Sequence, residues 1–343
     1  MFETILKKYD YQIPKDLIAQ KPVTPRDAAR LLVYEKLTKK IVDSTFKNLA
    51  DFIPTNAVLV FNETKVIPAR VETVKANGVK VIVSYVERKG KLIKVMLNKN
   101  VKVGDKLFLT RKTYFTVKKV DDKFFWLSCS FVLSGLNDIF EKYGRAPLPP
   151  YIDASPLSVK QARAEYQTVF AKTPGSIAAP TASLHFTKSL LRKLKAKGVT
   201  LQYVTLHVGL GTFALLTDEN FKRNKLHEEW YSIDHQTANI LAKAKAQNRP
   251  IIAVGTTVVR TLESAFNQRG KITKPKGSTA LFIREGYKFK VVNALITNFH
   301  VPKSSLLMLV CAFGKRSEIL KLYQHAIKKR YRLFSFGDGM LIK

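Results

Sequence analysis

The chain has 343 residues, which is enough for two domains of ordinary size, and its hydrophobic fraction of 46% is typical of a globular protein. The N-terminal segment contains no uninterrupted apolar run, and the longest one, Leu306 to Phe313, is far shorter than the ~20 residues that span a bilayer. Cys129 and Cys311 stand alone, so neither a zinc site nor a disulfide framework is indicated. We therefore expect a soluble, cytoplasmic protein without a signal peptide, a membrane span or a metal.

The charge is the unusual bulk property, with 59 Lys and Arg against 26 Asp and Glu and a formal net charge of +33. Such a field attracts polyanions and favours a nucleic-acid partner. A composition that is rich in lysine throughout would give the same number. Many lysines are indeed scattered, as between Lys188 and Lys197. The charge alone does not decide between these interpretations.

The first predicted strand is buried and runs from Ala57 to Phe61, and an all-β stretch follows from about residue 68 to about 146. Within that stretch, Val79 to Val86 and Lys91 to Leu97 are joined across Gly90 as a hairpin. The spacing of the remaining short strands is typical of a small barrel or sandwich. They are expected at Val103 to Leu109, Tyr114 to Val120 and Phe124 to Cys129, with a turn at Asp121 and Asp122 between the last two.

Strands and helices alternate in the second half of the chain. Thr187 and Asp234 are predicted helix caps, for helices to Leu194 and to about Gln247, and another helix is expected from Val258 to Asn267. Two helices are predicted near the end, at Ser304 to Phe313 and Ser317 to Lys329. The strands are expected at Val199 to His207, Pro250 to Val254, Ala280 to Ile283 and Phe289 to Leu295.

This pattern predicts a layered α/β main domain that is discontinuous in sequence, with a small β-barrel domain inserted into it. The expected boundaries are 1–67 and 147–343 for the main domain and 68–146 for the insertion.

Several junctions between strands and helices combine small and polar residues, and ligands bind at such strand ends in α/β sheets. The loop from Ser176 to Thr187 contains Thr181 and His185 and leads into a helix, whose free N–H groups suit an anion. The alternative is that Thr181 and Thr187 are ordinary caps and that His185 packs against the helix.

Further junctions follow along the chain. Gly209 and Gly211 after His207 permit a close backbone approach, although this Gly-x-Gly opens no helix and is a weak nucleotide signal. Gly255 to Thr257 forms a tight turn into a helix, on which Arg260 and Glu263 could pair with each other. Two more segments place a titratable group beside an aromatic ring, which suits base stacking as well as core packing. These are His227 to Tyr231 and Asn298 to Lys303.

None of these junctions matches a catalytic triad, a phosphate-binding loop or a metal-ligand pattern. Residue chemistry alone therefore indicates a metal-free α/β enzyme or binding protein with an anionic partner.

Taken in order, these junctions resemble the S-adenosylmethionine:tRNA ribosyltransferase-isomerases of queuosine biosynthesis. The resemblance covers nearly the whole chain and thins between about Val71 and Phe140. Its blocks are Leu17 to Gln20, Pro25 to Leu32, Asn62 to Arg70, Tyr143 to Ile152, Tyr166 to Val169, Ala178 to Thr187, His207 to Phe213, His227 to Tyr231, Gly255 to Ser264, Asn298 to Ser304 and Gly337 to Ile342. The chain departs from the family pattern at Glu63, Lys65, Ser183 and Gly339, where the family usually has Asp, Arg, Gly and Ala.

The resemblance implies an α/β domain with an inserted β-barrel, and a reaction that consumes S-adenosylmethionine as a co-substrate without any cofactor. The acceptor would be 7-aminomethyl-7-deazaguanine at the wobble position of tRNA with a GUN anticodon (the Asn, Asp, His and Tyr acceptors). The products would be epoxyqueuosine-tRNA, adenine and methionine. A monomer is expected. The chemistry calls for bases with a pKa near neutrality, which are histidines and desolvated carboxylates.

The resemblance also suggests which residues serve each role. The proton-transfer candidates are His185, His207 and Glu229, followed by His227 and His300. The candidates for binding S-adenosylmethionine are Thr181, Gly209, Gly211, Thr212, Thr256 and Thr257. The candidates for contacting tRNA are Arg26, Arg30, Lys65, Arg70 and Arg145.

Two other functions remain open at this point. A non-catalytic RNA-binding protein would bind tRNA without consuming S-adenosylmethionine. A methyltransferase would use the same donor and release S-adenosylhomocysteine, but the usual Gly-rich loop directly after a first strand is missing.

Overall fold

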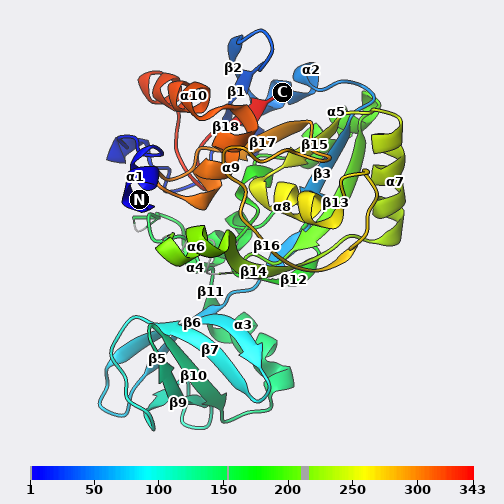
Figure 1. The fold of residues 1–343 in the computed structure, drawn as a ribbon. Helices are drawn as coiled ribbons and strands as arrows, with labels where there is room; N and C mark the ends of the chain where they lie inside the picture. Colours follow the sequence, from blue (N-terminus) through cyan, green and yellow to red (C-terminus); the bar gives the residue numbers. More distant parts are fainter. Residues whose placement is uncertain (1, 153, 210–215) are drawn as a thin grey trace.

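The computed structural model describes residues 2–152, 154–209 and 216–343, which form a large α/β body and a smaller β-barrel (Figure 1). The large body is built on a nine-stranded mixed sheet in which the four strands β13, β3, β15 and β17 lie side by side and parallel. In spatial order the strands are β16 (Lys276–Leu281), β14 (Lys225–Ser232), β13 (Thr200–Leu206), β3 (Val58–Asn62), β15 (Ile251–Val254), β17 (Ala294–Asn298), β18 (Gly339–Ile342), β1 (Arg30–Tyr34) and β2 (Ile41–Thr45).

Helices cover both faces of this sheet, and alternate residues of β3 point into the two hydrophobic cores between the sheet and these helices. Val58 and Val60 of β3 belong to one hydrophobic core, and Leu59 and Phe61 belong to another. The first core contains α7 (His235–Ala246), α8 (Thr256–Ala265), α9 (Ser305–Gly314) and α10 (Arg316–Lys328), and the second contains α2 (Leu49–Phe52) and α5 (Lys188–Ala196). The shorter helices of this body are α1 (Phe2–Lys7), α4 (Val159–Glu165) and α6 (Asp218–Arg223).

The predicted helix caps are confirmed. Thr187 Oγ1 accepts the backbone N–H of Leu190 at 3.1 Å, and Asp234 Oδ1 accepts that of Thr237 at 2.8 Å. The turn after α5 passes through Gly198, whose φ of +93° suits glycine.

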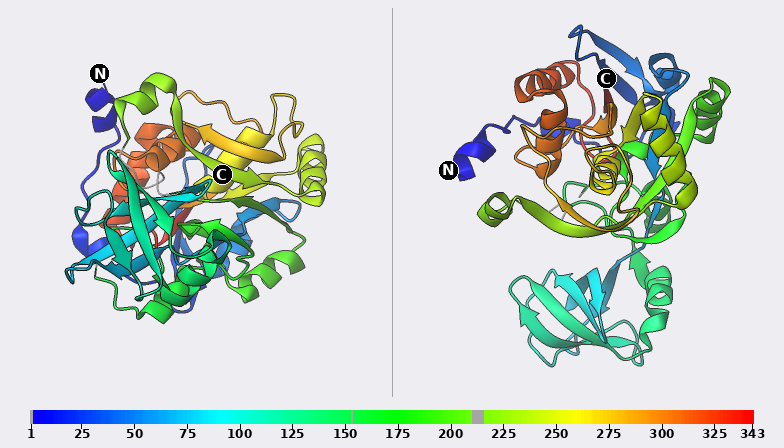
Figure 2. Two further views of the ribbon diagram at one scale, coloured as in Figure 1. Left: turned by 90° about the horizontal axis from the view of Figure 1, so that it is seen from below. Right: turned by 45° about the vertical axis from the view of Figure 1, so that its right-hand side comes forward.

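The smaller body is a closed barrel, as the sequence predicts. Its strands pair in the order β5 (Arg70–Val74), β6 (Lys80–Lys89), β7 (Leu92–Leu97), β10 (Phe124–Cys129), β9 (Tyr114–Asp121) and β8 (Lys106–Phe108). A pairing of Val74 with Phe108 joins β5 to β8 and closes the ring. The short strand β11 (Gly144–Arg145) pairs with β5, and α3 (Leu136–Tyr143) packs Leu136 and Phe140 into the barrel core. The right-hand view of Figure 2 places the barrel at one end of the large body.

The prediction of a strand from Phe289 to Leu295 is wrong for most of that segment, since β17 begins only at Ala294. The carboxylate of Glu263 on α8 provides the reason. It accepts the backbone N–H groups of Lys290, Val291 and Val292 at 2.8–3.1 Å, so these donors bond to a side chain instead of a neighbouring strand. The suggested pairing of Arg260 with Glu263 is also wrong, because the ion pair of Arg260 is formed with Glu229.

A two-stranded parallel sheet links distant parts of the chain near the barrel. It consists of β4 (Thr64–Val66) and β12 (Thr173–Ser176). β4 follows β3 almost directly, so this small sheet lies at the carboxyl end of the main parallel strands. Among the described residues, no helix is both long and apolar enough to span a membrane.

Candidate active site

The polar junctions singled out in the sequence meet at one edge of the main sheet. The strands β13, β3, β15 and β17 are parallel, so their carboxyl ends share that edge. The segments that follow them contain Thr64, His207, Thr256 and His300. The topology therefore gathers these side chains where ligands of α/β proteins usually bind.

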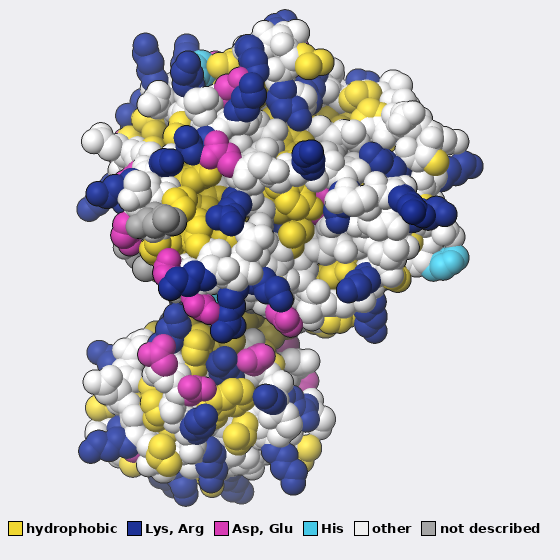
Figure 3. Space-filling view, viewed as in Figure 1, with side chains coloured by type: hydrophobic (Ala, Val, Ile, Leu, Met, Phe, Trp, Pro, Cys, Tyr) yellow, Lys and Arg dark blue, Asp and Glu magenta, His cyan; other side chains and the backbone are white. Residues whose placement is uncertain are grey.

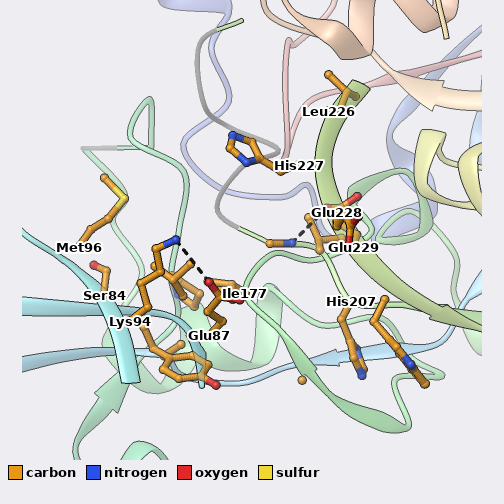
Figure 4. A pocket seen from close by; sticks show the side chains of 18 of the residues that line it. Ser84, Glu87, Lys94, Met96, Ile177, His207, Leu226, His227, Glu228 and Glu229 are labelled. Carbon is orange, nitrogen blue, oxygen red and sulfur yellow. Dashed lines mark hydrogen bonds and ion pairs between the residues drawn. The ribbon is translucent and has the colours of Figure 1, made fainter. Parts of the chain in front are cut away.

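A large cavity of about 880 Å³ opens between this edge and the barrel. From the main body it is lined by His207, Gly209 and the segment from Leu226 to Trp230 on β14. The barrel contributes Arg70, Ser84, Glu87, Arg88, Lys94 and Met96. Figure 4 shows His207, His227 and Glu229 on one side, with Lys94 and Glu87 joined by an ion pair on the barrel side.

A smaller cavity of about 260 Å³ adjoins the large one, and both are lined by Pro150, Val208 and Leu306. Its wall is rich in hydroxyl and amide groups, with aromatic rings from Tyr151, Phe299 and Phe334. The polar lining residues include Thr181, Thr256, Thr257, Asn298, His300 and Ser335. Such a lining suits a small polar ligand that also carries an apolar or aromatic part.

His207 follows β13 directly and is the histidine most firmly held at the large cavity. Its Nδ1 lies 2.8 Å from Thr64 Oγ1, and its ring stacks on Trp230 with a centroid distance of 5.0 Å. Burial lowers the pKa of His207, so the neutral imidazole is favoured at neutral pH.

Glu229 is buried and forms an ion pair with Arg260, which is also buried. Its Oε1 accepts the backbone N–H of Gly209 at 3.1 Å. Arg260 donates further bonds to the carbonyl oxygens of Leu281 and Thr279. The pair therefore ties β14, α8 and the segment after His207 together in the wall of the large cavity.

His185 lies behind the smaller cavity and lines neither cavity. It is 5% exposed, stacks on Phe46 at a centroid distance of 4.2 Å, and its Nε2 lies 3.3 Å from Asn298 Nδ2. Burial, with help from Arg332 and Arg26, lowers the pKa of His185 to about 3. The neutral ring therefore accepts a hydrogen bond from Asn298.

His300 contributes to the wall of the smaller cavity. Its Nε2 lies 2.8 Å from Thr297 Oγ1, and its backbone N–H donates to the hydroxyl of Tyr323 at 2.9 Å. Burial lowers the pKa of His300 to about 3. His227, by contrast, is exposed on β14 at the mouth of the large cavity.

Asn298 connects the two histidine-bearing segments, a role that the sequence does not reveal. Its Oδ1 accepts the hydroxyl of Thr181 at 2.9 Å, and its Nδ2 also donates to the carbonyl oxygen of Phe334 at 3.2 Å. The side chain is buried, so these bonds hold it in one orientation at the cavity wall.

Thr256 and Thr257 open α8 after Gly255, whose φ of +99° is strained for other residues. Asn62, fully buried, donates to Thr257 Oγ1 at 3.3 Å and to the carbonyl oxygen of Leu206 at 3.0 Å. The free N–H groups of the first turn of α8 are therefore fixed beside the smaller cavity. Two further candidates for binding S-adenosylmethionine, Gly211 and Thr212, lie outside the described residues.

The basic candidates differ in their surroundings. Arg26 donates to the carbonyl oxygens of Ala164, Glu165 and Gln167 at the end of α4. Arg30 stacks on the ring of Tyr331 at 3.8 Å and donates to the carbonyl oxygen of Lys329. The guanidinium groups of both residues are thus engaged within the protein.

The other basic candidates lie closer to the cleft or to solvent. Arg70 lines the large cavity, and its buried Nε has no hydrogen-bond partner among the described residues. Lys65 is exposed on β4, and Arg145 is exposed and 3.5 Å from the Glu72 carboxylate. Arg88, Lys94 and Lys123 of the barrel also line the cavity, which sequence patterns could not show. Figure 3 shows Lys and Arg side chains over both bodies and at the waist between them.

Within the described part of the chain, no group of three or more His, Cys, Asp or Glu side chains is placed to hold a metal ion.

An α/β body whose ligand-binding edge faces a basic barrel, across a cleft that contains histidine and carboxylate side chains, defines a two-domain enzyme suited to a large anionic substrate. The family model described as queuosine biosynthesis protein matches residues 6–342. The chain therefore belongs to the queuosine biosynthesis protein family.

Individual relatives agree with this assignment. The chain is 44% identical to the S-adenosylmethionine:tRNA ribosyltransferase-isomerase of Sulfurihydrogenibium sp., over 98% of this chain and 99% of that protein. It is 43% identical to the protein of the same name from Carboxydothermus hydrogenoformans, with the same shares covered. The crystal structure of S-adenosylmethionine tRNA ribosyltransferase from Thermotoga maritima matches with a TM-score of 0.56 and 31% identity, covering 98% of this chain and all of that one.

Proposed function

We propose that this chain is an S-adenosylmethionine:tRNA ribosyltransferase-isomerase. It transfers and isomerises the ribosyl group of S-adenosylmethionine onto 7-aminomethyl-7-deazaguanine in tRNA with a GUN anticodon. The products are epoxyqueuosine-tRNA, adenine and methionine. The observation that carries the proposal is the pair of adjoining cavities at the carboxyl edge of the sheet, in a chain that is 44% identical to a protein of this name.

The two cavities suit two substrates of different size. The smaller one, with the hydroxyls of Thr181 and Thr256 and the amide of Asn298, provides directional hydrogen bonds for part of S-adenosylmethionine. The larger one is open between the two bodies and accommodates a nucleotide that is turned out of the anticodon loop. The shared wall at Val208 and Leu306 brings the two ligands together.

The reaction requires several proton movements at this junction. A proton must leave the carbon beside the sulfonium, adenine must depart, and the aminomethyl group of the acceptor must be neutral when it attacks. His207, His227 and Glu229 lie at the large cavity and His300 at the small one, so these groups are within the proposed reaction space. His185 lies behind Asn298, and we assign it the role of orienting that amide.

The basic side chains at the cleft contact the tRNA backbone in this proposal. Arg70, Lys94 and Arg88 line the cavity from the barrel, and Lys65 and Arg145 are exposed. Phosphate contacts of this kind position the nucleic acid without reading its sequence. The internal bonds of Arg26 and Arg30 favour a structural role for these two residues.

We also propose that the enzyme acts in the cytoplasm as a monomer, because both walls of the large cavity come from one chain. Light scattering of the purified protein tests the monomer directly. A dimer that persists on dilution would contradict it.

The activity is tested with S-adenosylmethionine and tRNA that carries 7-aminomethyl-7-deazaguanine at the wobble position. Mass spectrometry of the nucleosides is expected to show epoxyqueuosine, with release of one adenine per modified tRNA. The same tRNA with unmodified guanine is the control and releases no adenine. Arg70→Ala should weaken tRNA binding. Lys193 lies on α5 and lines neither cavity, so Lys193→Ala is the control and should leave tRNA binding unchanged.

The alternatives give different products in the same assay. Formation of S-adenosylhomocysteine would show a methyltransferase. Binding of tRNA without adenine release under any of these conditions would show an RNA-binding protein.

A further inference from the structure

His207 is held by a small sheet whose two strands both contact its ring. Thr64 lies on β4 and Gly175 on β12, and these strands pair in parallel with Thr173 opposite Thr64. Thr64 Oγ1 lies 2.8 Å from Nδ1 of the imidazole. The two-stranded sheet thus provides a hydrogen-bond partner for His207 through Thr64 and a packing surface for its ring through Gly175.

The ring plane is fixed by packing. Trp230 stacks on the imidazole with an interplanar angle of 22°. A Cβ built on Gly175 would lie 2.7 Å from Nε2 and 2.9 Å from both Cδ2 and Cε1. These similar distances put that Cβ over the flat face of the ring and not at its edge. The absence of a side chain at Gly175 therefore lets the backbone of β12 pack against the face of the imidazole without covering its edge at Nε2.

The direction of the bond between Thr64 and His207 follows from burial. Thr64 is 0% exposed, and its hydroxyl proton needs an acceptor. Among the described residues, His207 Nδ1 is the one group bonded to this oxygen. The backbone N–H of Thr64 is separately satisfied by Asn62 Oδ1 at 3.1 Å. The hydroxyl of Thr64 consequently donates its proton to Nδ1.

This direction determines where the imidazole carries its own proton. A neutral histidine has one N–H, so an acceptor at Nδ1 places that N–H at Nε2. His207 lines the large cavity, and no described residue bonds to Nε2. Burial lowers the pKa of His207, which keeps the ring neutral at neutral pH.

We propose that Thr64 is a positioning residue that holds His207 in the tautomer with its proton on Nε2, so that His207 acts in the cleft as a neutral hydrogen-bond donor. In this state Nε2 has no free lone pair, so His207 does not remove the proton beside the sulfonium. It instead donates to an acceptor atom on a substrate that gains negative charge during the reaction. Proton removal then falls to another group at the cavity. The catalytic part of this inference rests on the proposed function, whereas the tautomer does not.

The tautomer is measured without substrate, by nuclear magnetic resonance of the protein labelled with nitrogen-15 in its histidines. His207→Gln identifies the signals of His207 by their loss. In the unaltered protein we expect an unprotonated Nδ1 and a protonated Nε2. The reverse pattern, with the proton on Nδ1, would overturn the inference even if the enzyme is fully active.

Two variants separate positioning from packing. Thr64→Val removes the hydroxyl at similar size, and Thr64→Ser keeps it. We expect Thr64→Val to give a mixture of tautomers and a kcat that is lower in proportion to the fraction with the proton on Nε2, with little change in KM. The loss would approach roughly 10²-fold, the effect of removing a preorganised donor, only if that fraction were close to zero. Thr64→Ser should keep the proton of His207 on Nε2 and should retain most of the rate of the unaltered protein. An unchanged tautomer in Thr64→Val, or an equal loss of rate in both variants, would contradict the assignment. If Thr64→Val does not fold, the spectra of the unaltered protein and Thr64→Ser still decide the tautomer.

Discussion

The substitution Gly175→Ala displaces the His207 ring without removing it, and so tests whether the position of that ring matters. The new Cβ would lie 2.7 Å from Nε2, whereas ordinary contacts begin at 3.4 Å. The imidazole must therefore move by at least about 0.7 Å, or the β12 backbone must move instead. A displacement of about 1 Å at a reacting centre costs up to roughly 10²-fold in rate. We expect kcat to fall about 10- to 10²-fold.

The backbone adds a second effect that has to be separated from the first. Gly175 has a φ of +144°, which is strained for alanine and costs about 1–3 kcal/mol of stability. Gly78→Ala is the matched control, because its φ is +83° and a Cβ there meets nothing within 4 Å. Both variants should melt a few degrees lower than the unaltered protein.

The assay is release of adenine in a single turnover, measured per folded molecule. Gly175→Ala should lose rate and Gly78→Ala should retain it. A normal rate in Gly175→Ala, in a variant whose crystal structure shows the His207 ring displaced, would refute the argument that the position of the packed ring contributes to catalysis. An equal loss in the two variants would assign the effect to backbone strain in general.

Four further results are expected. The pKa of His185 is lowered by burial to about 3, so the stability it contributes is complete above the unfolded value near 6.5 and is lost as the pH falls towards 3. The free energy of unfolding, measured with urea between pH 6 and 4, should therefore fall more steeply with pH in the unaltered protein than in His185→Gln, by about 1.4 kcal/mol per pH unit. Equal slopes in the two proteins would disprove this. Ser183→Ala should raise the free energy of unfolding by about 1 kcal/mol, because the buried hydroxyl has no partner among the described residues. Ser176→Ala is its control and should destabilise, since that hydroxyl bonds to Ala178 and Val208. The affinity for tRNA should fall as salt is added, and each phosphate contacted should contribute roughly 0.7–0.9 to the slope of log binding constant against log salt concentration. An affinity that does not change with salt would show that the net charge reflects a lysine-rich composition and not tRNA binding. Activity should survive EDTA, and loss of turnover that zinc or iron restores would refute a metal-free reaction.

Local signals in the sequence were sufficient for most of the fold. Caps such as Thr187 and Asp234 act within one turn of helix, and short β-branched runs define strands wherever they pair. The segment from Phe289 was predicted wrongly because its backbone N–H groups bond to Glu263, a side chain on another element. A contact between distant segments leaves no trace in local periodicity.

The location of the candidate site also followed from the sequence, because polar residues after successive parallel strands must share one edge. The arrangement within the site did not. Thr64 and Gly175 reach His207 only because β4 pairs with β12, and neither residue is among the site candidates that the sequence indicates. Asn298 belongs to one of the segments that the sequence singles out, but its role depends on hydrogen bonds to Thr181 and His185, which lie far away in the sequence.

The basic residues show the same limit most clearly. The sequence could not distinguish Arg26, which caps the end of α4, from Arg70, which lines the cavity. Lys94 was not predicted, because strand alternation does not tell which side of a barrel faces the other domain.

Ribosyl transfer is distinguished from methyl transfer with two preparations of S-adenosylmethionine, one labelled in the ribose and one in the methyl group. Each is incubated with the enzyme and tRNA that carries 7-aminomethyl-7-deazaguanine. We expect the ribose label to become attached to tRNA and the methyl label to be recovered in free methionine. Recovery of the methyl label in tRNA, with the ribose label in S-adenosylhomocysteine, would show that the enzyme is a methyltransferase and not a ribosyltransferase.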